Sequence, residues 1–385
     1  MTSLAPAESG TGTATTDKIQ VMVVDDSAVV RGLVSRWVDE DPDMETCGRF
    51  PDGKLAVSGI VKCNPDVVIL DIEMPIMDGM TALPELLKLK PDVRIIIAST
   101  LSRRNAEISL KALSLGATDY IPKPESNRGV TTSVEFRNEL LRKVKAVAQV
   151  GRAGTHPNEP AAPRPSVSGT SFHSAAPAVG GEAYELRAFS AVTPRILAIG
   201  SSTGGPQALA KVIAAVAPAA AQIPIIITQH MPPTFTAILA EHLGRASGLT
   251  AREGEDGEKI LPGNIYVAPG GLHMAVVEKD ASPFLHTYDG PMVNFCKPAV
   301  DPLFESIASI YGRAALALVL TGMGHDGAHG AKQIADAGGS VIAQDRSTSV
   351  VWGMPGAAVE AGACAAILPL EEIGPKASTL LRGGR

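Results

Sequence analysis

Three carboxylates, one hydroxyl and one lysine follow short β-branched runs in the first third of the chain. They are Asp25, Asp26, Asp71, Ser99 and Lys123. Side chains beyond the carboxyl ends of parallel strands meet at one edge of an open sheet. Carboxylates gathered there suit Mg²⁺, which prefers a few oxygen ligands plus waters. The metal and the lysine would together neutralise a phosphoryl group carried by one carboxylate.

A helix N-cap is the alternative explanation for any single aspartate at a strand end. Three carboxylates that share matching strand ends with a serine and a lysine favour the binding site.

A serine in a glycine-rich turn begins a second group of candidate residues. Ser202 is the centre of a G-x-S-x-G pattern between Gly200 and Gly204. This pattern is typical of the strand–turn–helix that raises a nucleophilic serine above a sheet. Two phosphate-binding alternatives fail, because a P-loop requires Lys where Pro206 stands and the dinucleotide pattern requires Gly at position 202. The pattern alone also fits an ordinary glycine-rich turn.

Two further strand ends supply partners for this serine. His230 follows the run at residues 225–228, and Asp326 follows the run at residues 315–320. A nucleophilic serine needs an imidazole to accept its proton and a carboxylate to fix the imidazole tautomer. Glycines around Met323 would allow backbone N–H groups to face an oxyanion. The order Ser–His–Asp differs from that of the usual α/β-hydrolases.

The remaining histidines and cysteines are weaker candidates. His325 and His273 are the histidines that could lie near the site. The four cysteines form no C-x-x-C pair, so we interpret them as scattered buried thiols.

The elements that must position these residues alternate between strand and helix. The sequence predicts an α/β protein with two domains, a (βα)5 domain at residues 18–150 and a doubly wound, mostly parallel domain at residues 194–385. Residues 1–17 are expected to be a disordered tail, and the Ala/Pro/Gly-rich residues 151–193 a linker. A β-hairpin is expected on the edge of the second sheet within residues 250–290.

Composition excludes some functions. The formal net charge of the 385 residues is -6, with no Lys/Arg-rich stripe, which argues against nucleic-acid binding. No signal peptide and no apolar run of about 20 residues stands out. We therefore expect a cytoplasmic protein without membrane insertion.

The first group of residues resembles the response-regulator receiver domain. The resemblance rests on the motifs at residues 23–27, 70–75, 78–79 and 123–124. It implies that Asp71 accepts the phosphoryl group, and that Asp25, Asp26, Asp71 and the carbonyl of Glu73 bind Mg²⁺. It also implies a switch formed by Ser99, Tyr120 and Lys123.

The second group resembles the chemotaxis protein-glutamate methylesterase family. The matching segments are residues 199–205, 227–233, 268–270, 273–274, 320–327 and 351–355. The resemblance implies Ser202 as nucleophile, His230 as base and Asp326 as orienting acid. It also implies an oxyanion hole formed by Thr203 and the N–H of Met323, and no cofactor at the esterase site.

Together the resemblances imply a phosphorylation-activated esterase of chemotaxis. Its substrates would be glutamate γ-methyl esters, and some glutamines, of methyl-accepting receptors. Its phosphodonor would be a chemotaxis histidine kinase. We expect the protein to be a monomer. Two other functions remain as alternatives. A transcriptional response regulator predicts a small basic output domain, and an inactive adaptor would retain the fold only for docking.

Overall fold

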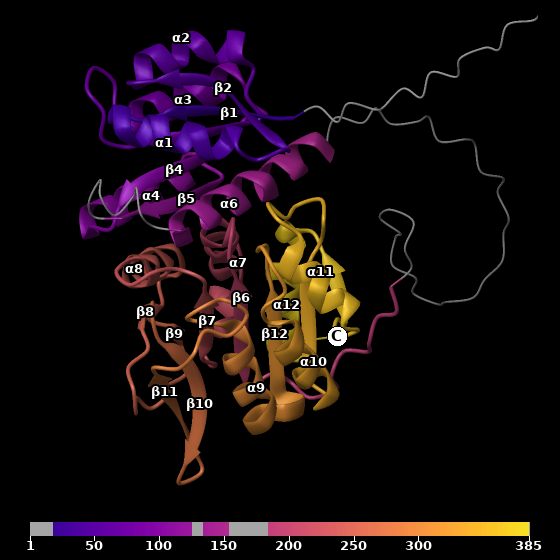
Figure 1. The fold of residues 1–385 in the computed structure, drawn as a ribbon. Helices are drawn as coiled ribbons and strands as arrows, with labels where there is room; N and C mark the ends of the chain where they lie inside the picture. The colour runs from indigo at the N-terminus through magenta and orange to yellow at the C-terminus, as the bar shows by residue number, and fades with distance from the viewer. Residues whose placement is uncertain (1–17, 125–133, 154–183, 385) are drawn as a thin grey trace, which may run out of the picture.

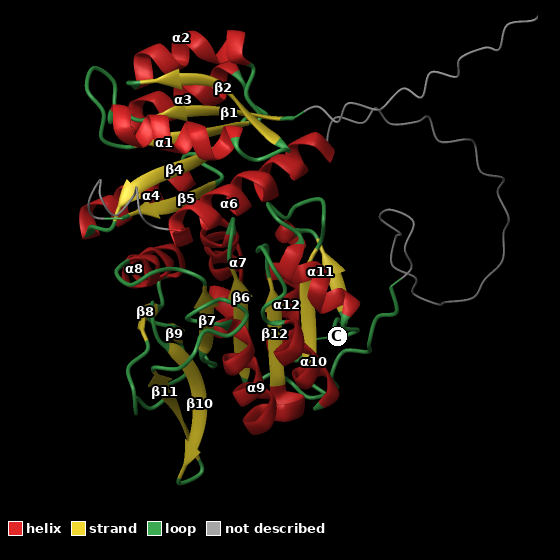
Figure 2. Cartoon of the chain, in the orientation of Figure 1, coloured by secondary structure: helices red, strands yellow, loops and turns green. Residues whose placement is uncertain are grey.

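The structure is a computed structural model that describes residues 18–124, 134–153 and 184–384. It contains two parallel sheets, one of five strands and one of seven, and a separate two-stranded hairpin. Helices cover both faces of each sheet (Figure 1, Figure 2). The predicted two-domain α/β fold is confirmed.

The first domain has the strand order β2-β1-β3-β4-β5, with every pair parallel. Its strands are nearly all buried because helices lie on both faces. Side chains of Ser27, Asp52, Asp78 and Ser102 cap the first four helices at their N-termini. The elements are β1 (Ile19–Val24), α1 (Ala28–Asp39), β2 (Met44–Phe50), α2 (Gly53–Cys63), β3 (Val67–Asp71), α3 (Gly79–Leu89), β4 (Arg94–Thr100), α4 (Arg103–Ser114), β5 (Asp119–Lys123) and α6 (Val134–Ala153).

The second domain has the strand order β14-β13-β12-β6-β7-β9-β8. The central strands β6, β7 and β12 begin with apolar runs and are buried along their whole length, as expected for strands covered on both faces. The elements are β6 (Ile196–Ser201), α7 (Gly205–Ala220), β7 (Ile225–Gln229), α8 (Phe235–Ser247), β8 (Thr250–Glu253), β9 (Asn264–Val267), β10 (His273–Lys279), β11 (Ser282–Tyr288), α9 (Val300–Tyr311), η1 (Gly312–Ala314), β12 (Ala315–Val319), α10 (Ala328–Asp336), β13 (Ser340–Gln344), α11 (Gly353–Glu360), β14 (Ala366–Leu368) and α12 (Leu370–Leu381).

The region at residues 250–290 differs from the expectation. A hairpin is present, but β10 and β11 form an antiparallel sheet of their own, outside the large sheet. The edge of the large sheet is instead β8, which pairs with β9 in parallel. The short sequence of β8, with two charged residues, carries no alternating apolar pattern that would have predicted a strand.

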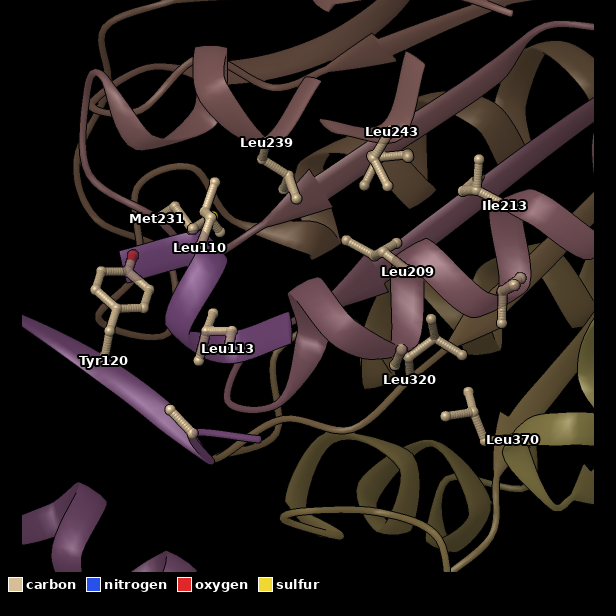
Figure 3. Close-up of a cluster of buried hydrophobic side chains, with 14 of the residues drawn as sticks. Leu110, Leu113, Tyr120, Leu209, Ile213, Met231, Leu239, Leu243, Leu320 and Leu370 are labelled. Carbon is tan, nitrogen blue, oxygen red and sulfur yellow. The ribbon is translucent and has the colours of Figure 1, made fainter. Parts of the chain in front are cut away.

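The two domains share a continuous hydrophobic contact. Leu110 and Leu113 of α4 belong to the same buried cluster as Met231 and Leu239 of the second domain. Figure 3 shows these side chains facing one another across the junction. The ring of Tyr120 stacks on that of Phe235, with centroids 4.6 Å apart and an interplanar angle of 10°. The carboxyl edge of the second sheet therefore lies beneath α4 and β5.

The expected tail at residues 1–17 and most of the expected linker lie outside the described residues, so the domain limits stay a prediction. Within residues 184–193, however, the chain contacts the second domain. The N–H of Arg187 donates to the carbonyl of Cys364, and the N–H of Ser190 donates to Ser340 Oγ. Within the described ranges, no helix has both the length and the apolar character needed to span a membrane.

Candidate functional sites

The strand ends of the first domain bring the predicted acidic residues together. Asp25, Asp26 and Asp71 place carboxylate oxygens within 4.8 Å of one another. Asp25 and Asp71 are buried, and Asp26 is exposed. The Lys123 ammonium lies 2.7 Å from Asp71 Oδ1 and 3.1 Å from Asp25 Oδ2. Three carboxylates open to solvent on one side fit Mg²⁺, which keeps several of its waters when bound.

Burial and charge set the protonation of this cluster. Burial raises the pKa of Asp71 to about 6; the Lys123 ammonium lowers it and the Asp25 carboxylate raises it further. Burial lowers the pKa of Lys123, but the Asp71 and Asp25 carboxylates outweigh burial and raise it overall. At neutral pH, Asp71 is therefore ionised beside a charged lysine.

The other predicted receiver residues lie around this cluster. Ser99 is buried and shares a hydrogen bond of 2.8 Å with the Ser109 hydroxyl. Glu73 is exposed in the loop between β3 and α3. Tyr120 is buried at the domain junction, where the Lys143 ammonium lies 5.3 Å from its ring centroid. Burial, with the nearby Asp119 and Glu139 carboxylates, raises the pKa of the Tyr120 hydroxyl.

Ser202 follows β6 in a tight turn before α7. Ser201 and Gln229 are paired in the ladder of β6 and β7, and the His230 N–H donates to the Ser201 carbonyl at 3.1 Å. Ser202 and His230 thus leave neighbouring strands side by side. Gln229 Nε2 donates to the Ser202 carbonyl, and Ser201 Oγ donates to Gln229 Oε1. This buried network fixes the backbone on both sides of the serine.

His230 and Asp326 form a close, largely buried pair. His230 Nε2 lies 2.7 Å from Asp326 Oδ2, with side chains 12% and 2% exposed. Burial lowers the pKa of His230, but the hydrogen bonds to Asp326 and Cys296 raise it well above its ordinary value. Burial raises the pKa of Asp326, but the contact with His230 lowers it overall. The pair favours a protonated imidazole beside an ionised carboxylate.

Cys296 contacts the other ring nitrogen of His230, Nδ1. Its Sγ lies 3.4 Å from His230 Nδ1. Ser202 Oγ forms no hydrogen bond with any described residue. The interpretation of the cysteines as buried thiols was wrong for three of the four, since only Cys364 is buried. No spacing signal marks Cys296, because a loop 66 residues after His230 in the sequence brings it to the site.

Two donors near Ser202 have no partner. The Thr203 hydroxyl is buried without a hydrogen bond, and no described group accepts the N–H of Met323. The backbone just before Met323 is held in place, because Gly322 N donates to the Val351 carbonyl and the Thr321 hydroxyl donates to the Thr203 carbonyl. These are the two predicted oxyanion donors, and an unpaired buried hydroxyl such as that of Thr203 is uncommon.

Asn294 is a second site residue that the sequence analysis missed. Its Nδ2 donates to Asp326 Oδ1 at 2.9 Å and to Asp301 Oδ2 at 2.8 Å.

The weaker histidine candidates lie apart from the reactive atoms. His325 is exposed, whereas buried His273 lies 2.9 Å from the carbonyl of Pro291 and accepts from the N–H of Ala299. His273 therefore braces both ends of the loop that carries Asn294 and Cys296.

Comparisons with known proteins agree with both predicted domains. A family model described as CheB methylesterase matches residues 197–377, and one described as response regulator receiver domain matches residues 21–135. A protein-glutamate methylesterase/protein-glutamine glutaminase of Rhodopseudomonas palustris is 53% identical, with 96% of each chain covered. One of the same name from Azospirillum brasilense is 48% identical, with 96% of this chain and 95% of the relative covered. The CheB methylesterase catalytic domain of Thermotoga maritima is 41% identical, covers 49% of this chain and all of that one, and gives a TM-score of 0.47.

The fold and the family matches define a class of protein in which a receiver domain is joined to a methylesterase domain of doubly wound α/β fold. The identity of about half over nearly the whole chain then assigns the family. The chain belongs to the CheB methylesterase family, the receiver-linked protein-glutamate methylesterases.

Proposed function

We propose that this chain hydrolyses glutamate γ-methyl esters on methyl-accepting chemotaxis receptors, deamidates receptor glutamines to glutamate, and is activated by phosphorylation of Asp71. The observation that carries the hydrolase proposal is the His230–Asp326 pair beside Ser202, at the carboxyl ends of three neighbouring strands. The names of the relatives give the same two activities.

The geometry supports the following steps. Asp326 accepts a hydrogen bond from Nε2 of His230, so Nδ1 is the nitrogen left to accept a proton. His230 takes the proton of Ser202 as the serine oxygen attacks the ester carbonyl, and then gives that proton to the departing methanol. Water, activated by the same imidazole, cleaves the acyl-serine and releases glutamate. With a glutamine substrate the leaving group is ammonia.

The two unpaired donors near Ser202 would stabilise the negative charge of the oxyanion that forms during the reaction. The Thr203 hydroxyl and the Met323 N–H flank the loop contact between residues 203 and 321. Donors already fixed in place lower the cost of forming an oxyanion, and loss of one such donor typically costs about 10²–10³ in kcat.

The identity of the nucleophile is open to a direct test. Ser202→Ala should lower methanol release from methylated receptor membranes by at least about a thousandfold, whereas Cys296→Ala should retain most of the release. The opposite result would make Cys296 the nucleophile of a Cys–His–Asp arrangement, which its contact with His230 also permits. Labelling of Ser202 by a fluorophosphonate probe separates an active chain from an inactive adaptor.

The receiver site supports the proposed control of this activity. Asp71 is paired with Lys123, and burial raises the pKa of its carboxyl group. A neighbouring face of the same domain, formed by Tyr120 and α4, packs on two residues that follow His230 in the chain, Met231 and Phe235. Phosphorylation would add charge at Asp71 and weaken this contact, which opens the esterase site to a receptor helix.

A small phosphodonor with Mg²⁺ tests the switch. Methanol release by the wild type should rise with phosphodonor, and release by Asp71→Asn should stay at the basal rate. Equal activation of both chains would reject Asp71 as the acceptor. When bound, Mg²⁺ would be held by Asp25, Asp26, Asp71 and the Glu73 carbonyl, and would neutralise the charge on the phosphoryl oxygens.

A further inference from the structure

We propose that Cys296 and His230 form a binding site for a soft divalent metal ion such as Zn²⁺ inside the esterase site, and that an ion bound there reversibly stops hydrolysis. The donor atoms of Cys296, His230 and Asp326 all lie within 4.8 Å of one another. The proposal that a metal ion binds here depends on this geometry alone. Only the proposal that the ion stops hydrolysis rests on the proposed function.

The distance between the two donors matches a tetrahedral ion. Zn²⁺ binds imidazole nitrogen at about 2.0 Å and thiolate sulfur at about 2.3 Å, so a tetrahedral angle separates these atoms by roughly 3.5 Å. The observed separation of Cys296 Sγ from His230 Nδ1 is 3.4 Å. An ion can therefore bridge them without movement of either residue.

Asp326 fixes the imidazole in the orientation that metal binding requires. A histidine that binds metal through one nitrogen usually donates its other N–H to a carboxylate. Asp326 Oδ2 lies 2.7 Å from Nε2 and also accepts the N–H of Val300 at 2.6 Å. Asp326 Oδ1 accepts from Asn294 Nδ2. The carboxylate is thus held in place, and it leaves the lone pair of Nδ1 directed at the thiol.

The loop that carries Cys296 is also fixed. Val293 and Cys296 exchange two backbone hydrogen bonds, of 3.1 and 2.9 Å. Asn294 and Phe295 between them adopt positive φ angles of 51° and 64°. Bulky residues rarely adopt this conformation, so the turn persists because its surroundings determine it. The thiol is therefore held ready for a ligand and does not depend on a mobile loop.

The donor chemistry favours soft ions. One thiolate and one imidazole favour Zn²⁺ or Co²⁺ over Mg²⁺, which binds oxygen. The carboxylates of Asp25, Asp26 and Asp71 form the opposite kind of site in the same chain. On binding, the thiol proton and the Nδ1 proton of the protonated imidazole pass to solvent, and water fills the positions that the protein leaves open, so the site exchanges its ion.

Inhibition follows from the atom that the ion occupies. His230 Nδ1 is the nitrogen left to accept the proton of Ser202, since Nε2 is engaged by Asp326. A metal on Nδ1 removes that lone pair. The serine then loses its base even though its own position is unchanged.

Two readouts on the full chain test the proposal. Titration with Co²⁺ should produce a thiolate-to-cobalt charge-transfer band in the wild type and in the matched control Cys63→Ser, and no band in Cys296→Ala. The band should weaken in His230→Ala, with affinity at least about tenfold lower, because loss of a direct ligand costs at least as much as loss of a supporting one. This readout does not require an active enzyme.

The second readout is fluorophosphonate labelling of Ser202 with buffered Zn²⁺, with each chain compared with its own metal-free rate. Labelling should fall with Zn²⁺ in the wild type and Cys63→Ser, and stay constant in Cys296→Ala. A cobalt band that persists in Cys296→Ala, or labelling of that variant that falls over the same Zn²⁺ range, would overturn the metal site. A wild type that binds cobalt but is never labelled would reject the serine hydrolase and leave the metal site standing.

Discussion

At the scale of single residues, His230 is the group whose environment matters most. Asp326 and Cys296 contact its two ring nitrogens, and together they raise its pKa despite burial. A raised pKa makes His230 a stronger base, but the residue is protonated over more of the pH range. Only the neutral imidazole can accept the proton of Ser202.

The pH profile of the esterase should therefore be shifted to the alkaline side. The neutral fraction of His230 grows as pH rises through its raised pKa, so kcat/KM should still be rising above the ordinary histidine pKa of about 6.5. The measurement is methanol release at constant ionic strength across neutral and alkaline pH. Asp326→Asn removes the carboxylate that raises the pKa, so its residual activity should rise at lower pH. If the rise of kcat/KM with pH in the wild type is centred near the ordinary histidine pKa, this explanation is wrong.

The acidic site makes a separate prediction at the residue scale. The pKa of Asp71 is raised to about 6, mainly by burial. Protons therefore compete with Mg²⁺ below that pH, and the apparent affinity for Mg²⁺ should fall about tenfold per pH unit below 6. Calorimetric titration with Mg²⁺ from about pH 5 to about pH 8 measures this dependence of the affinity on pH. An affinity that is flat down to pH 5 argues against Asp71 as a ligand.

At the scale of elements, the turns after β6 and β12 approach each other closely. A Cβ added at Gly322 would lie 2.9 Å from Ser202 Cβ and would also overlap Met354 Sδ. The loop after β13 holds Gly322 in that place through hydrogen bonds from Gly322 N to Val351 and from Met354 N to Gly322. The position of the serine thus depends on three elements that are distant in sequence.

Gly322→Ala should consequently inactivate the esterase while the chain stays folded. The methyl group pushes Ser202 from its place, and a displacement of about 1 Å costs about a hundredfold in rate. Methanol release and circular dichroism measure activity and folding. Gly32→Ala in α1 is the control, since no atom lies within 4 Å of its added Cβ. It should keep full activity and gain up to about 1 kcal/mol in free energy of unfolding.

At the scale of the whole molecule, the junction between the domains combines apolar packing with a few polar contacts. Gln207 Nε2 of α7 donates to the carbonyls of Leu113 and Ala117, at 2.5 and 2.6 Å. Arg103 forms an exposed ion pair with Glu241. Exposed ion pairs contribute little, whereas loss of Gln207 removes a donor from two receiver carbonyls, of which that of Leu113 keeps the N–H of Gly116.

Basal activity reports on this junction. Gln207→Ala should weaken docking by about 1–2 kcal/mol, which corresponds to a shift of roughly 5- to 30-fold in the docking equilibrium. Methanol release without phosphodonor should rise accordingly, and activation by phosphodonor should shrink. Arg103→Ala should change basal release by less than about threefold. Equal, unchanged basal rates in both variants would show that the junction does not restrain the esterase.

Much of this protein is determined by local sequence. Apolar runs that end in Asp25, Asp71, Ser202 and His230 define the strands, and parallel strands bring their ends to one edge. The alternation of strand and helix defined both α/β domains, and the turn residues placed the proposed reactive groups. These features depend on neighbours in the chain, which is why pattern and motif were sufficient for them.

Tertiary structure alone decided the rest. Cys296 and Asn294 reach His230 and Asp326 from an irregular loop with two positive φ angles, and no periodicity encodes that path. The stacking of Tyr120 on Phe235 depends on the packing of two separate domains. The edge strand of the large sheet is β8, because the β10–β11 hairpin lies outside that sheet and β11 instead bonds with residues 257–260. Each of these contacts joins segments far apart in sequence, where packing and long-range hydrogen bonds, and not local propensity, determine the outcome.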